Sequence, residues 1–167
     1  HLMEPQRKQA PHLPIDYFFR SLAQDQKSRA ICIVLSGTGS DGTVGLRTVK
    51  EAGGLTMAQD PQTAEYDGMP RSAINTGMVD YVLPAHQMPD RLQAYVDRAF
   101  RRAEKVTPVA DSDGAMEKVF VLLRDQIGHD FSHYKSSTIH RRLERRMAVE
   151  QVEDIESYLE ILRDNPI

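Results

Sequence analysis

The sequence predicts an α/β protein: part of a doubly wound parallel sheet, followed by a small all-helical domain. A short apolar run at residues 30–35 breaks into a glycine-rich segment and then a helical pattern, and a second extended run follows at residues 55–60. This order of strand, helix and strand over about 30 residues is typical of parallel sheets. After residue 114, apolar residues recur only at helical spacing, which predicts a change of fold class within the chain.

The first 14 residues contain three prolines and no apolar period, so we expect an extended lead-in there. A helix should follow from Pro14, which is tolerated in a first turn, with Asp16 favourable near the positive helix end. Helical spacing predicts that its inward side is formed by Ile15, Phe18, Phe19 and Leu22.

The glycine-rich segment after the first strand runs from Gly37 to Gly42. In the helix that follows, apolar residues recur at one-turn intervals; we expect Asp41 to cap its start and Gly53 to follow its end. Ligands bind at the carboxyl ends of parallel strands, so we expect the chemistry at residues 37–42 and at Gln59 and Asp60.

A third strand is predicted at residues 78–83, and a last amphipathic helix of the first domain runs to residue 102. We therefore place the first domain at residues 1–102 and a linker without periodicity at residues 103–114. Three helices should fill residues 115–167: the first ends at Gly128, the second covers about residues 137–149, and the third begins near residue 152. The first has its apolar stripe at Met116, Val119, Phe120, Leu123 and Ile127.

Composition narrows the functional classes. The 167 residues carry 21 basic and 24 acidic side chains, a formal charge of -3, so the whole chain is not typical of nucleic-acid-binding proteins. No apolar run approaches the roughly 20 residues of a membrane span, and no secretory signal is evident. We therefore expect no membrane insertion and a cytoplasmic location. The single cysteine, Cys32, lies within the first strand and is expected in the core.

Residues 37–42 also fit the G-x-G-x-x-G spacing of a dinucleotide site, and Asp60 lies where a ribose-binding carboxylate would be expected. Asp41 weighs against this interpretation, because its carboxylate would repel a pyrophosphate at the helix start. Two roles for Asp41 stay open together: a helix cap, and an orienting carboxylate for a catalytic histidine. Free N–H groups in such a turn can also serve as oxyanion donors.

Two further motifs lie in the helical part. His129 and His133 are four residues apart, but Gly128 ends the helix before them and no third ligand is evident, so we predict no metal site. Residues 135–147 carry five basic side chains against one acidic. Such a stripe is commonly a solvated face, and it also suits docking to an acidic partner. The arginines of the stripe, paired at four-residue spacing, are Arg141, Arg142, Arg145 and Arg146.

Four segments at residues 33–46, 58–60, 68–74 and 79–83 together resemble the chemotaxis-receptor protein-glutamate methylesterase family, the CheB type. The resemblance covers residues 14–102, and its first segment includes Gly37-Thr-Gly-Ser-Asp-Gly42. Residues 116–167, with the arginine-rich helix, are similar to the N-terminal helical domain of the receptor-glutamate methyltransferase family, the CheR type. In this order the two resemble a piece of a fusion between a methylesterase and a methyltransferase.

The resemblance implies a serine hydrolase with a Ser-His-Asp triad. It assigns the triad aspartate to Asp41 and an oxyanion N–H to the main chain of Thr38, a position where the family more often has methionine. The family's serine and histidine lie upstream of the residues matched here, and its S-adenosylmethionine domain lies beyond Ile167. The esterase part is therefore expected to need no cofactor, and the isolated chain is expected to be inactive. The implied partner is the cytoplasmic domain of chemoreceptors, which the four arginines of the stripe would contact.

An alternative stays open, in which the chain is a non-enzymatic interaction module whose basic helix binds an acidic partner. In either case, the strand at residues 30–35 is expected to lack a sheet neighbour on one side. An exposed apolar strand edge favours pairing with another chain, so we expect self-association.

Overall fold

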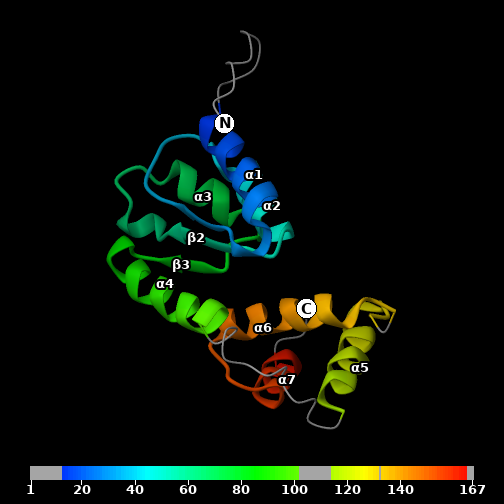
Figure 1. The fold of residues 1–167 in the computed structure, drawn as a ribbon. Coiled ribbons are helices and arrows are strands. Elements are labelled where there is room, and N and C mark those ends of the chain that lie inside the picture. The colour runs from blue at the N-terminus through cyan, green and yellow to red at the C-terminus, as the bar shows by residue number, and fades with distance from the viewer. Residues whose placement is uncertain (1–12, 102–113, 132, 165–167) are drawn as a thin grey trace. The chain divides into compact units, whose positions relative to one another are not determined.

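The computed structural model describes residues 13–101, 114–131 and 133–164. The chain divides into two compact units, His1–Ala85 and His86–Ile167 (Figure 1). The second unit therefore includes a helix that the sequence pattern places in the first domain. The predicted linker and most of the predicted lead-in lie outside the described residues, so the domain boundary stays a prediction.

The first unit is built around a three-stranded sheet with the order β1-β2-β3. Both pairings are parallel: Ile31 lies opposite Leu55, and Met57 lies opposite Tyr81. The predicted parallel α/β fold is thus confirmed. Its helices and strands, in chain order, are α1 Pro14–Gln26, β1 Ile31–Val34, α2 Thr43–Glu51, β2 Leu55–Gln59, α3 Gly68–Ile74 and β3 Tyr81–Leu83.

Strand β2 is buried along its whole length, which explains its mostly apolar sequence. In β1 burial alternates, and Cys32 and Val34 face the core. The predicted core position of Cys32 is confirmed. The core of the first unit joins α1, β1, α2, β2 and α3 through Phe19, Ala23, Ala30, Cys32, Val34, Leu46, Val49, Ala58 and Ala73.

The predicted inward side of α1 is wrong at one position. Phe19 is buried and Ile15 and Leu22 are partly buried against the core, whereas Phe18 is 60% exposed. Asp16 takes a buried position on the same helix instead. Helical spacing fits an inward side formed by residues 15, 16, 19 and 23 as well as the predicted one that includes residue 18. Spacing alone therefore does not decide between the two.

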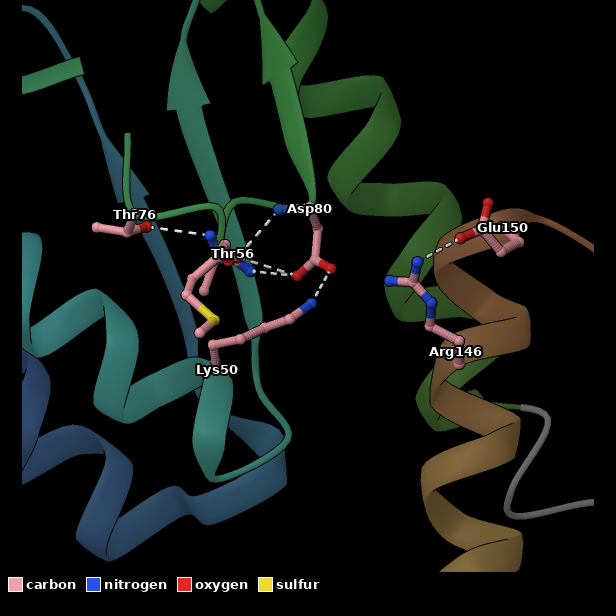
Figure 2. Close-up of polar contacts among 7 residues, drawn as sticks. Lys50, Thr56, Thr76, Asp80, Arg146 and Glu150 are labelled. Carbon is pink, nitrogen blue, oxygen red and sulfur yellow. Dashed lines mark hydrogen bonds and ion pairs between the residues drawn. The ribbon is translucent and has the colours of Figure 1, made fainter. Parts of the chain in front are cut away.

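Polar side chains join the starts of β2 and β3 at the amino end of the sheet (Figure 2). The Asp80 carboxylate, only 1% exposed, pairs with the Lys50 ammonium and accepts the Thr56 N–H at 3.0 Å. The Thr56 hydroxyl donates to the Met78 carbonyl at 2.6 Å and accepts the Asp80 N–H at 3.1 Å. These bonds anchor the chain before β3 to both β2 and the end of α2.

The second unit is helical, as predicted for residues 115–167. The apolar core of the three helices that follow α4 includes Met116, Val119, Leu143, Tyr158 and Leu159. Gly128 ends α5 with a left-handed φ of 69°, a conformation that favours glycine. No helix in the described ranges is both long and apolar enough to cross a bilayer. The elements are α4 Met88–Val96, a π-helical turn at Asp97–Arg101, α5 Ala115–Ile127, α6 Ser136–Glu150 and α7 Ile155–Asp164.

Candidate functional site

The loop that follows β1 is held by the end of β2. The side-chain carbonyl of Gln59 accepts the Ser36 N–H at 2.9 Å, and its amide group donates to the Thr63 carbonyl at 3.0 Å. Gln59 is 8% exposed although it ends a strand. A buried amide whose donor and acceptor are both satisfied is a rigid support, so the exit of β1 is fixed relative to β2.

A second set of bonds holds the same loop to the segment before α3. The Gly37 N–H donates to the Tyr66 carbonyl at 2.8 Å, and the Gly37 carbonyl accepts the Met69 N–H at 2.9 Å. A Cβ on Gly37 would lie 2.4 Å from the Met69 sulfur, and one on Gly68 would lie 3.0 Å from the Gly39 nitrogen. At Gly68 the contacts are with main chain, so glycine there permits the close approach of two main chains, whereas at Gly37 the neighbour is the Met69 side chain.

Thr38 is exposed between these anchored positions. Within the described ranges, neither its N–H nor that of Gly39 has a hydrogen-bond acceptor, whereas the N–H groups of Ser36 and Gly37 do. Gly39 adopts φ +86°, which reverses the chain after Thr38. A fixed turn with unused N–H groups can donate to a developing oxyanion. The role of Thr38 stays a prediction that this geometry favours.

Asp41 caps α1, not the helix that follows it. Its Oδ2 accepts the Ile15 N–H at 3.1 Å, and its Oδ1 accepts the Asp16 N–H at 3.0 Å. The expectation that Asp41 caps α2 is wrong, because Gly42 with φ +91° lies at that cap position and no side chain there caps the helix. The start of α2 is instead bound from α1, by Asp16 Oδ1, which accepts the Gly45 N–H at 2.7 Å.

The geometry of Asp41 leaves room for one more interaction. A carboxylate offers about four acceptor directions, and two of them are filled by main-chain donors. Asp41 is half-buried, so it is reachable, and it lies on a loop at the carboxyl end of β1. The arrangement can hold an imidazole N–H in a fixed direction, which is the task of a triad carboxylate.

The same contacts weigh against a dinucleotide at the start of α2. The Thr43 N–H donates to the Ser40 carbonyl at 3.2 Å and the Gly45 N–H donates to Asp16, so donors that a pyrophosphate would need are occupied. The carboxylates of Asp16 and Asp41 add negative charge there. Asp60 accepts the Gln62 N–H at 2.9 Å and so begins a short 3-10 turn.

His129 and His133 lie in a connection that is not helical, so their spacing does not place them on one helix face. The His129 ring lies edge-on to Phe131, with 4.7 Å between centroids, and its Nε2 is 3.2 Å from the Tyr134 hydroxyl. Among the described residues, no group of three or more potential ligands could hold a metal ion. His129 thus belongs to an exposed aromatic cluster.

The four arginines of α6 fall into two kinds. Arg145 donates to the Tyr95 hydroxyl at 3.1 Å. Arg146 pairs with Glu150 at 2.9 Å (Figure 2). Burial of the Tyr158 hydroxyl raises the pKa of Tyr158, and the positive charge of Arg146 partly opposes this rise. Arg141 and Arg142 are exposed and have no ion pair or hydrogen bond to another side chain within the described ranges. Their guanidinium groups are therefore the more available to a partner.

Sequence patterns do not reveal the roles of Gln59 and Asp16. The pattern places Gln59 at a strand end where chemistry is expected but does not predict that its side chain supports the loop after β1, and it identifies Asp16 only as a charge favourable to its own helix. A polar side chain that ends an otherwise apolar, fully buried strand is a signal that could have identified Gln59. The Asp16 contact with Gly45 spans 29 residues and leaves no local pattern.

Comparison with known proteins identifies the families that the two parts of the chain match. Residues 2–92 match the model of the family described as CheB methylesterase, and residues 114–167 match the one described as CheR methyltransferase, all-alpha domain. A Rhizobium meliloti protein named protein-glutamate methylesterase/protein-glutamine glutaminase of group 3 operon is 44% identical over 78 residues, covering 47% of this chain and 22% of the relative.

Two further similarities extend this picture. An uncharacterized 104.1 kDa protein of Rhodobacter capsulatus is 40% identical over 96% of this chain, which covers 19% of that protein. The crystal structure of the Thermotoga maritima CheB methylesterase catalytic domain is 43% identical, with a TM-score of 0.45 over 46% of this chain and 41% of that one.

The chain spans about a fifth of the length of the two curated relatives named above. The family match over residues 2–92 includes the β1 loop with Asp41 and the Gln59 support, and the second match includes the arginine-rich helix α6. The chain thus belongs to the CheB methylesterase family over its α/β part and continues into the all-alpha domain of a CheR methyltransferase.

Proposed function

We propose that this chain forms part of a bifunctional chemotaxis protein that hydrolyses and forms methyl esters on receptor glutamates. The observation that carries the esterase half is the loop after β1. There, Asp41 is held by two main-chain donors while the N–H of Thr38 stays unused within the described ranges. In the proposed reaction Asp41 orients and stabilises the catalytic imidazole, and the Thr38 N–H stabilises the tetrahedral oxyanion.

The proposed triad needs a serine and a histidine that this chain does not supply. The chain covers 22% of the Rhizobium meliloti relative, and we expect both residues in a part of the protein that corresponds to the rest of such a relative. The 167-residue chain alone should not hydrolyse methyl esters, since losing the nucleophile and base removes roughly 10⁶-fold of rate in another triad enzyme. The Rhizobium meliloti relative is also named a glutaminase; amide hydrolysis forms the same kind of oxyanion, so one donor would serve both reactions.

The decisive experiment replaces Asp41 in a longer protein that joins this sequence to the rest of its methylesterase domain. Asp41→Asn keeps the shape and an acceptor for α1 but removes the charge that stabilises an imidazolium. We expect kcat for methyl-ester hydrolysis to fall on the order of 10³–10⁴-fold, as for the equivalent change in a worked triad. The matched control is Asp25→Asn, at an exposed position near the end of α1, which should retain activity. Full activity in Asp41→Asn would refute the assignment.

We propose that helix α6 is the part of the chain that contacts the receptor. Arg141 and Arg142 are exposed without a side-chain partner in the described ranges, and their charge suits an acidic segment of a chemoreceptor's cytoplasmic domain. Arg145 and Arg146 have partners within their own unit, so we assign them a smaller part in docking. A non-enzymatic module that only docks on such a partner is the second candidate, favoured by the same two side chains.

Peptide binding separates the two kinds of arginine. Arg141→Ala and Arg142→Ala should each weaken binding to an acidic receptor peptide several-fold at low salt, and the loss should shrink as salt rises. Lys118→Ala, which removes an exposed charge from α5, is the matched control and should bind like the parent chain. Equal binding by all variants would exclude this face as the docking surface.

The methyl donor is proposed to be S-adenosylmethionine, bound outside this chain. The described part of the helical unit has no strand whose carboxyl end could hold a ribose beside an acidic side chain. We assign no residue here to the donor. A cytoplasmic location is likewise proposed, since receptor glutamates of this class are presented on the cytoplasmic domain.

A further inference from the structure

Asp16 lies in the first turn of α1 and is only 2% exposed. Its Oδ1 accepts the Gly45 N–H at 2.7 Å, while its Oδ2 is buried and has no hydrogen-bond partner among the described residues. Burying a carboxylate oxygen without a partner is costly.

The main chain of Asp16 gives a reason for its position. Its N–H donates to Asp41 Oδ1 at 3.0 Å, beside the bond from the Ile15 N–H to Asp41 Oδ2. The two aspartates thus bind reciprocally: the side chain of Asp41 holds the start of α1, and the side chain of Asp16 holds the start of α2. The loop that carries Asp41 leads directly into α2, so the bond from Gly45 to Asp16 also limits where the Asp41 carboxylate can lie relative to α1.

Close packing makes this brace stiff. A Cβ on Gly45 would lie 2.8 Å from the Asp16 carbonyl oxygen and 2.6 Å from the Phe19 Cβ. The first turns of α1 and α2 therefore cannot approach further, and the Gly45 to Asp16 bond prevents them from separating. Because the spacing between the first turns of α1 and α2 is fixed, the Asp41 carboxylate is held in one orientation. Its lone pairs that accept no α1 amide therefore point in a fixed direction.

We propose that Asp16 is a positioning residue for Asp41, fixing the two α1 amides that hold the Asp41 carboxylate in the direction required by a histidine. This inference rests on the proposed function of Asp41. In metal sites, residues that orient a ligand through one intermediate contact contribute about 10–100-fold, and in enzymes a misplacement of about 1 Å can cost about 10²-fold. Asp16 does not itself touch the reacting atoms.

The first test uses the 167-residue chain and nuclear magnetic resonance. In the parent chain, the main-chain amides of Ile15 and residue 16 donate to the Asp41 carboxylate and should be protected from hydrogen exchange. Asp16→Asn keeps a carbonyl acceptor for Gly45 and should preserve this protection. Asp16→Ala removes the acceptor, and the two amides should lose their protection. Protection of both amides retained in Asp16→Ala would overturn the proposal.

Two further variants control for a loss of folding in this test. Asp154→Ala removes a capping carboxylate from α7, where Asp154 accepts the Ser157 N–H at 2.7 Å, and should leave the exchange protection of the Ile15 and Asp16 amides unchanged. If Asp16→Ala does not fold, Asp16→Ser provides the decisive spectrum, because its side chain is shorter and should not reach the Gly45 N–H. Unchanged exchange protection of the two amides in Asp16→Ser would equally overturn the proposal.

The second test measures hydrolysis in the longer protein. Asp16→Ala, or Asp16→Ser if needed, should lower kcat about 10–100-fold with little change in KM, and Asp16→Asn should restore kcat to within about threefold of the parent. If Asp41→Asn loses activity while Asp16→Ala keeps the parental kcat, the positioning role of Asp16 is refuted. The proposed function of Asp41 is then still supported. Parental activity in Asp41→Asn would refute the proposed function itself.

Discussion

The side-chain carbonyl of Gln59 accepts a hydrogen bond from the Ser36 main-chain N–H at 2.9 Å, joining the ends of two neighbouring parallel strands. Its amide nitrogen is used as well, on the Thr63 carbonyl at 3.0 Å. This buried side chain therefore supports the loop with Thr38 where it leaves the sheet, together with the main-chain bonds of Gly37. Without it, the Ser36 N–H would lose its acceptor.

Gln59→Leu should lower the free energy of unfolding by about 2 kcal/mol, since it leaves a main-chain donor and a main-chain acceptor unsatisfied in a partly buried site. Urea unfolding followed by circular dichroism measures this change. Gln62→Leu is the matched control: its side chain is exposed, and such substitutions usually stay within about 0.5 kcal/mol. Equal stability of the two variants would show that the Gln59 amide does not support the loop.

The Lys50 to Asp80 pair should contribute far more than a surface ion pair. Asp80 is 1% exposed and also accepts the Thr56 N–H, so Asp80→Ala removes the partner of a charge and of a main-chain donor. Removing one partner of a buried pair costs about 3–5 kcal/mol. Lys50 is 29% exposed and its ammonium can turn to water, so we expect a loss of about 3 kcal/mol, at the lower end of that range.

A double-mutant cycle isolates the pair itself. Lys50→Ala, Asp80→Ala and the double variant should give a coupling free energy of about 1–3 kcal/mol. The exposed pair between Arg71 and Asp67, with 61% and 45% side-chain exposure, serves as reference and should give about 0.3–0.5 kcal/mol. Similar coupling in both cycles would mean that burial adds nothing at Asp80.

Cys32 should resist thiol reagents in the folded chain. Burial, and secondarily the negative charge of Asp80, raises the pKa of Cys32 from 9.0 to about 12. The thiolate is the nucleophile, so at about pH 8 the folded chain should react with a disulfide reagent only at the rate of its unfolding, whereas the chain in urea should react at once. Rapid stoichiometric reaction under native conditions would contradict the buried position.

The same shift predicts how stability depends on alkaline pH. The folded state holds the Cys32 proton more tightly than the unfolded state, so its contribution is complete below pH 9.0 and is lost as pH rises toward about 12. Cys32→Ala should therefore show a shallower decline in the free energy of unfolding over this window. Parallel declines in the two chains would indicate that Cys32 is not the group that titrates.

Local patterns predict the parallel strands, the helices and the glycine turns, because each depends on residues within about one helical turn or one strand. The errors involve contacts between distant residues. Phe18 and Asp16 both fit a helical stripe, and only the close approach of Gly45 to α1 decides that the acid is buried and the ring exposed. Sequence position favours the nearer helix for Asp41, although its two oxygens accept from amides 25 and 26 residues earlier.

The arginines of α6 also show that sequence patterns do not predict contacts between distant residues. Its four members are equivalent by spacing, and the sequence offers no means of ranking them. The ranking comes from partners elsewhere in the helical unit: Tyr95 lies 50 residues before Arg145, while Glu150 follows Arg146 by one turn. The Glu150 pair could have been predicted from sequence; the Tyr95 contact could not.

Strand β1 has one neighbour, β2, in the described sheet, and we expect its other edge to pair with a second copy of the chain. Ile31 and Ile33 are only half-buried there, and unpaired N–H and C=O groups at an apolar edge favour strand addition. Ile33→Lys should convert a concentration-dependent dimer into a monomer, measured by sedimentation equilibrium, because a charge on an edge strand opposes pairing. Val82→Lys, at an exposed position of β3, should still dimerise. A parent chain that remains monomeric at high concentration would refute the expected association, and equal loss of dimer in both variants would locate it elsewhere.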